Sequence, residues 1–141
     1  HTSMNMQPEE LWKAAARARE NAYAPYSDFR IGAALLTTDG RVFLGASMES
    51  SSYGATICAE RAAFASAVSS GARSFAAIAV AGAPGSQPPV NPCPPCGLCL
   101  QVMAEFCKPD FPIYLADGKG GIFHYLLGNL LPHVFHAAQA Q

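Results

Sequence analysis

The chain has 141 residues, of which half are apolar and 13% are charged, and its formal net charge is −1. This length suits a single domain with its own core, and the low content of charged residues leaves a surface on which subunits can associate. We find no basic stripe that could neutralise phosphates, no apolar run of spanning length and no signal peptide, so we expect no nucleic-acid or membrane partner and a small neutral substrate instead.

The first elements predicted along the chain are a helix and a hairpin. A helix is expected over residues 8–21, because a proline and two acidic residues open it and an apolar stripe follows. Two strands are expected over residues 29–37 and 42–47, since Asp39-Gly40 between them is a strong hairpin signal. A polar segment over residues 50–54 then predicts a loop.

The second half of the chain is predicted to alternate helices with strands. Gly71 ends a helix that starts near Cys58. The continuous apolar run after it, with Ile78 and Val80, indicates a buried strand. A proline-rich loop separates that strand from a second helix that carries cysteines. The predicted elements are a helix over 58–70, a strand over 75–81, a loop over 83–95, a helix over 97–106, short strands over 112–116 and 121–124, and a final helix over 126–131.

This order of elements predicts an α/β domain in layers, with one mixed sheet covered by helices. No internal repeat and no linker to a second domain is visible. Residues 1–3, which precede Met4, look like the remnant of an expression tag. The single predicted domain therefore covers residues 4–141.

The five cysteines form an odd set, with Cys93, Cys96 and Cys99 crowded into one segment. A secreted disulfide framework usually shows an even count in a shorter chain. We therefore expect reduced cysteines that bind a metal ion, in a cytoplasmic protein. Cys107 is expected to be a spectator thiol.

Three of these cysteines can form one zinc site with an open position. Cys96 and Cys99 share the first turn of a helix, and Cys58 opens another helix, so both helix N-termini favour the thiolate forms. Three thiolates hold one Zn²⁺ and leave its fourth position for a water. Glu60 is placed to move protons to and from that water. Arg61 is expected to offset the negative charge as a donor behind the ligands.

Other interpretations of these residues remain open. Cys93 could be a fourth ligand of a closed, purely structural zinc site. Cys93 and Cys96 also form a Pro-Cys-x-x-Cys pair, but the two prolines between them disfavour a helical pairing. Three cysteines at three-residue spacing also fit part of an iron–sulfur run. Arg61 could be a plain surface residue, and Glu60 only a helix-terminal carboxylate.

The Cys-x-Glu and Pro-Cys-x-x-Cys segments together resemble the signature of the zinc nucleobase deaminases. More of the chain is similar to the small cytidine deaminases, in the order and spacing of that family. The resemblance runs from about residue 8 to residue 135, and its specific blocks are residues 22–29, 53–63, 95–106 and 130–135.

The resemblance implies a three-layer α/β/α fold with a mixed five-stranded sheet, one zinc ion per subunit, and a homotetramer with active sites at subunit interfaces. It implies hydrolytic deamination of cytidine or 2′-deoxycytidine to uridine or 2′-deoxyuridine and ammonia, in pyrimidine salvage. By position, the zinc ligands are Cys58, Cys96 and Cys99, and Glu60 is the acid and base. The implied nucleoside pocket contains Phe29, Ser47, Glu49, Ser51, Tyr53 and Phe135, although Phe29 and Phe135 could instead serve ordinary packing.

The chain departs from the family pattern at two positions. Ser47 stands where the family usually has an asparagine that holds the ribose 3′-hydroxyl beside Glu49. Leu100 stands where an arginine usually follows the last cysteine. These departures motivate a second hypothesis, in which the substrate is a modified cytosine nucleoside that is N4-substituted or of the blasticidin type. A non-catalytic zinc module is the third hypothesis.

Overall fold

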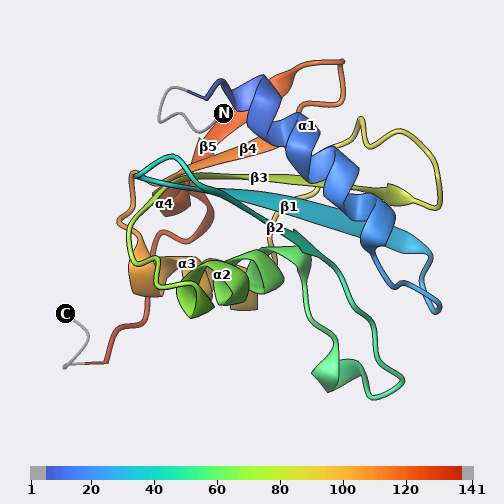
Figure 1. Ribbon diagram of the computed structural model, residues 1–141, viewed down its shortest axis with the longest axis horizontal. Helices are drawn as coiled ribbons and strands as arrows, with labels where there is room; N and C mark the ends of the chain where they lie inside the picture. Colours follow the sequence, from blue (N-terminus) through green and yellow to red (C-terminus); the bar gives the residue numbers. More distant parts are fainter. Residues whose placement is uncertain (1–5, 138–141) are drawn as a thin grey trace.

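The computed structural model describes residues 6–137, which form one five-stranded sheet with helices on both faces (Figure 1). The tag predicted at residues 1–3 lies outside the described residues. In chain order the elements are α1 (Pro8–Ala18), η1 (Arg19–Asn21), β1 (Phe29–Thr37), β2 (Val42–Ala46), η2 (Tyr53–Ala55), α2 (Ala59–Ser69), β3 (Phe75–Pro84), α3 (Gly97–Phe106), β4 (Pro112–Ala116), β5 (Ile122–Leu126) and α4 (Leu127–Leu130).

The sheet has the strand order β2-β1-β3-β4-β5. Strand β1 pairs antiparallel with both β2 and β3, β3 pairs parallel with β4, and β4 pairs antiparallel with β5. Gly40 adopts a positive φ of 91° in the predicted hairpin, a conformation that glycine reaches without steric cost. The prediction of a mixed five-stranded sheet is therefore confirmed.

Helix α1 covers one face of the sheet (Figure 1). The strands present small side chains to it, which allows the helix backbone to come close. At Gly32 the approach is closest, because a Cβ atom there would lie only 2.1 Å from the carbonyl oxygen of Ala15. The alanines buried on this face of the strands are Ala34, Ala77, Ala79 and Ala81.

Helices α2 and α3 cover the opposite face, where the larger core lies (Figure 1). Phe64 of α2 packs among other aromatic rings in this core. Gly45 lets α2 sit directly on β2, because a Cβ atom at Gly45 would lie 2.2 Å from the carbonyl oxygen of Ala59. The predicted three-layer α/β/α architecture is therefore confirmed, and the N-terminus of α2 is held firmly against the sheet.

The structure extends two strands beyond their predicted C-terminal ends. Strand β3 continues to Pro84 instead of residue 81, because the start of β1 pairs with it as far as Phe29. A terminal proline is tolerated there since it lacks only a donor. Strand β5 continues to Leu126, which pairs with Pro112. Among the described residues, no helix combines the length and apolarity needed to cross a membrane.

Candidate active site

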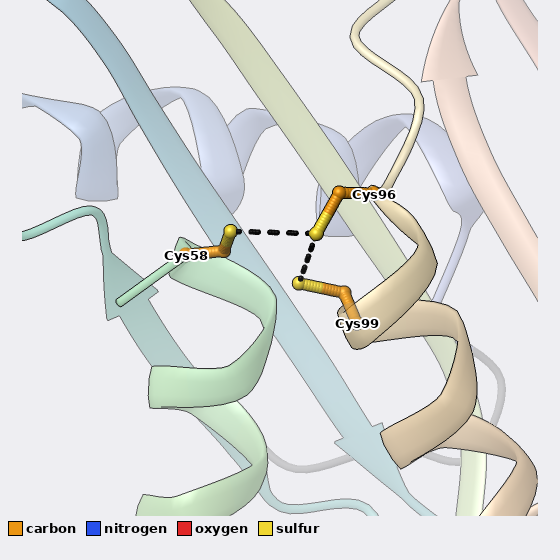
Figure 2. Close-up of side chains that lie close together, drawn as sticks. All are labelled: Cys58, Cys96 and Cys99. Carbon is orange, nitrogen blue, oxygen red and sulfur yellow. Dashed lines mark hydrogen bonds between the residues drawn. The ribbon is translucent and has the colours of Figure 1, made fainter. Parts of the chain in front are cut away.

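Three cysteines converge where the N-termini of α2 and α3 meet (Figure 2). Cys58 is the N-cap residue of α2, Cys96 is the N-cap residue of α3, and Cys99 lies in the first turn of α3. Their sulfur atoms all lie within 4.8 Å of one another. The Cys58 and Cys96 sulfurs are 3.7 Å apart, and those of Cys96 and Cys99 are 3.6 Å apart.

This spacing fits a zinc ion. Two sulfurs bound tetrahedrally at a Zn–S distance of about 2.3 Å lie about 3.8 Å apart. Cys93 is not part of the cluster; its sulfur lies over Gly82, beside the side chains of Phe29 and Ile31. The described residues therefore offer three sulfur ligands, as predicted, and not the closed set of four.

Cys58 is the thiol of the cluster whose ionisation is favoured. The pKa of Cys58 is lowered to about 5, chiefly because the Cys99 thiol donates a hydrogen bond to its sulfur, with Arg61 contributing further. The pKa of Cys99 is raised, mainly by that same hydrogen bond. The Nη2 atom of Arg61 lies 3.7 Å from the Cys58 sulfur and also donates to the carbonyl oxygen of Thr56 at 3.3 Å. Arg61 thus lies where a donor behind the cysteine ligands is expected.

Glu60 is buried next to the cluster, with only 4% of its surface exposed. Its Oε1 atom has no hydrogen-bond partner among the described residues. Burial raises the pKa of Glu60 to about 7. A buried carboxyl with an unused oxygen and a pKa near neutrality is suited to accepting and returning protons.

A second group of polar residues surrounds Glu49, which follows β2. Its carboxylate accepts hydrogen bonds from the backbone N–H groups of Tyr26, at 3.0 Å, and Ser27, at 3.2 Å, and from the Ser27 hydroxyl. The Ser27 hydroxyl is the main reason that the pKa of Glu49 is lowered. A cavity of about 220 Å³ opens here. It is lined by Tyr26, Ser27, Glu49, Ser50, Tyr53 and Thr56.

The other residues expected in the nucleoside pocket are spread out. Phe29 is partly exposed at the start of β1, while Ser51 lies on the segment that extends away from the sheet between β2 and α2 (Figure 1). Ser47 is buried, and its hydroxyl accepts the N–H of Ile31 at 3.2 Å. Phe135 is 75% exposed, and the Gln101 side chain donates to its carbonyl oxygen at 2.8 Å.

The chain thus brings the three cysteines, Glu60 and Arg61 together, and Tyr53 with Glu49, but leaves Ser51 and Phe135 at the surface. Sequence reasoning missed Ser27, which contacts Glu49 across 22 positions. The only available signal was that Ser27 belongs to one of the blocks that carry the family resemblance. No spacing rule relates it to Glu49.

Comparison with known proteins identifies the family. The model of the cytidine and deoxycytidylate deaminase zinc-binding region matches residues 5–115. The cytidine deaminase of Sporosarcina psychrophila is 48% identical over 130 residues, which cover 92% of each chain. The cytidine deaminase of Halalkalibacterium halodurans is 48% identical over 132 residues, which cover 94% of this chain and 96% of that one.

A solved structure shows the same fold. The crystal structure of cytidine deaminase from Burkholderia pseudomallei superposes with a TM-score of 0.83 at 47% identity, covering 92% of this chain and all of that one. The chain therefore belongs to the cytidine and deoxycytidylate deaminase family of zinc-binding, hydrolytic deaminases.

Proposed function

We propose that this protein hydrolyses cytidine and 2′-deoxycytidine to uridine and 2′-deoxyuridine, with release of ammonia. The observation that carries the proposal is the pairing of the three-cysteine cluster with the buried carboxyl of Glu60, whose Oε1 atom is unpartnered. The names of the relatives at 48% identity support cytosine nucleosides as the substrate class.

The cysteines would hold the metal ion. A zinc ion on Cys58, Cys96 and Cys99 would acidify a water at its remaining position and so supply the oxygen nucleophile. The low pKa of Cys58 favours the thiolate that such a ligand requires. Arg61, which contacts the Cys58 sulfur, offsets part of the negative charge of three thiolates.

Glu60 would carry the protons of the reaction. Water adds its oxygen to C4 of the cytosine ring, and the first proton that it loses passes through the Glu60 carboxylate to N3. The remaining proton of the new C4 hydroxyl then passes through the same carboxylate to the amine. The C4–N bond breaks, ammonia leaves, and the C4 carbonyl of uridine forms. One group must therefore accept and donate in turn, which is most efficient when its pKa lies near the operating pH. The value of about 7 for Glu60 meets that condition.

Glu49 would bind a hydroxyl of the sugar, in the cavity that Tyr53 also lines. Phe29 and Phe135 would contact the base, and Ser47 and Ser51 would complete the pocket. The exposed side chains of Tyr53 and Phe135, at 77% and 75%, support an association in which subunits complete one another's sites, and the proposed assembly is a homotetramer. A neighbouring subunit would cover both rings.

The two departures from the family pattern fit this substrate. Leu100 stands where the family usually has an arginine, and its side chain is buried in the core. It therefore packs inside the protein and makes no new contact with the nucleoside. The Ser47 hydroxyl already accepts the Ile31 N–H and is buried, so it adds little to sugar binding. Whether the substrate is instead a modified cytosine nucleoside is decided by the following test.

The test is an ultraviolet absorbance assay with cytidine and 2′-deoxycytidine on the zinc-loaded protein and two variants. Glu60→Gln should abolish turnover while zinc content stays at one per subunit. Glu105→Gln, an exposed substitution on α3, is the control and should retain turnover. Absence of turnover of either nucleoside by the zinc-loaded parent protein would overturn the proposal, and turnover of N4-substituted cytidines alone would establish the modified substrate.

A further inference from the structure

The turn between α1 and β1 holds Glu49 and Phe29 through a single side chain. The Ser27 hydroxyl donates to the Glu49 carboxylate and at the same time accepts the N–H of Phe29 at 3.0 Å. Ser27 therefore links the residue proposed to bind the sugar with the residue proposed to contact the base.

The turn is fixed on both sides. Asp28 adopts a positive φ of 57°, the left-handed region that non-glycine residues rarely occupy. Its N–H donates to the carbonyl oxygen of Ala24 at 3.0 Å, and its own carbonyl oxygen accepts the N–H of Gly85 at 2.7 Å. Asp28 is the only non-glycine residue with a positive φ among residues 6–137. Such backbone strain persists only where the surroundings determine the conformation.

Counting acceptors shows what Ser27 leaves available. A carboxylate offers about four lone-pair sites. Two backbone N–H groups occupy Oε1 of Glu49, and the Ser27 hydroxyl occupies one site on Oε2. One acceptor site then remains, on Oε2 of Glu49, which also accepts the Ser27 hydroxyl. The cavity that Glu49 and Ser27 both line lies beside this carboxylate. A ligand hydroxyl would meet a carboxylate already locked in orientation.

We propose that Ser27 is a positioning residue for nucleoside binding, which acts through Glu49 by holding its carboxylate with one acceptor facing the cavity and by tying it to Phe29. The proposal rests on the proposed function, since it assigns the sugar to Glu49. Among the described residues, the Ser27 hydroxyl hydrogen-bonds with Glu49 and Phe29 and with none of Cys58, Glu60, Cys96 and Cys99. We therefore expect Ser27 to affect binding of the nucleoside and not the proton transfers.

The kinetic test uses Ser27→Ala, Ser27→Thr and the matched control Ser66→Ala, which removes an exposed hydroxyl from α2. Ser27→Ala should raise KM for cytidine roughly three- to tenfold, with kcat within about twofold of the parent value, as expected for loss of one hydrogen bond. Ser27→Thr keeps the hydroxyl and should restore most of the loss. An unchanged KM, or a fall in kcat alone, would overturn the proposal.

A second readout works without turnover. Nuclear magnetic resonance titration of the Glu49 side chain should show a higher pKa in Ser27→Ala than in the parent protein, and no change in Ser66→Ala. If the parent protein turns over neither nucleoside, the proposed function fails, but this titration still tests the link between Ser27 and Glu49. An unchanged Glu49 pKa in Ser27→Ala would refute that link in a folded protein.

Discussion

The guanidinium of Arg61 lies 3.7 Å from the sulfur of Cys58, one helical turn away along α2. The residue that caps the helix is thus paired with a cation on the same helix. Because the helix N-terminus also favours negative charge, two independent fields act on one sulfur. The pKa of Cys58 is lowered chiefly by the hydrogen bond from Cys99, and Arg61 contributes further.

Arg61→Ala is expected to weaken zinc binding while leaving the fold intact. Removal of the cation raises the pKa of Cys58 and leaves the charge of three thiolates uncompensated, and loss of a donor behind metal ligands typically costs about 10- to 100-fold in affinity. Competition with a chromogenic chelator measures the change. Arg17→Ala, an exposed substitution on α1, is the control. Equal zinc affinity in both variants would contradict a role for Arg61 at the cluster.

The five cysteines are expected to separate into two groups. Alanine at Cys58, Cys96 or Cys99 should lower the zinc content well below one per subunit, because each removes a ligand. Alanine at Cys93 or Cys107 should leave the zinc content at one per subunit, because both thiols lie outside the cluster. Burial is the main reason that the pKa values of both thiols are raised, which disfavours the thiolate form that binds zinc. Atomic absorption measures the zinc content. Loss of zinc in Cys93→Ala would contradict this prediction and support the interpretation of a closed site with four cysteine ligands.

Local patterns predicted the elements that position this cluster, but not all of its surroundings. Cys96 and Cys99 could be paired from sequence because they share one helical turn. The extension of β3 to Pro84 could not, since the proline and glycine there indicate a turn and only pairing with β1 keeps the strand going. The contact between Ser27 and Glu49 joins two loops, and no helix or strand period relates their positions.

Substitution of Gly45 is expected to reduce both stability and zinc binding, whereas substitution of Gly32 is expected to reduce stability alone. Alanine at either position places a Cβ within 2.2 Å of a helix backbone, so both variants should lose stability, by about 1–3 kcal/mol or more. Gly45→Ala pushes against Ala59 and so displaces the start of α2, which carries Cys58 and Glu60. Gly32→Ala pushes against α1 on the opposite face.

Urea unfolding and zinc affinity together separate these two effects. Both variants should unfold at lower urea concentration than the parent protein. Only Gly45→Ala should also lose zinc affinity and activity when measured under conditions where it is still folded. Equal zinc affinity in the two folded variants would mean that the packing of α2 against β2 does not determine the position of the cysteine ligands.

Phe135 and Glu60 are expected to act in the same site from different subunits. Phe135 is 75% exposed in the single chain, so Phe135→Ala should reduce nucleoside binding with little change in the stability of the subunit. A mixture of Phe135→Ala and Glu60→Gln subunits, dissociated and reassembled, creates sites in which Glu60 of one subunit meets Phe135 of its neighbour. Such sites contain both intact residues, which no site in either parent variant does.

Activity of the reassembled mixture above that of both parent variants is therefore the expected result. Mixing the same variants without dissociation is the control and should give only the average of the two. Light scattering before and after reassembly checks that the proposed homotetramer has re-formed. If the re-formed tetramer shows no gain, each site is built from one chain, and the exposed ring of Phe135 must serve packing between subunits instead of nucleoside binding.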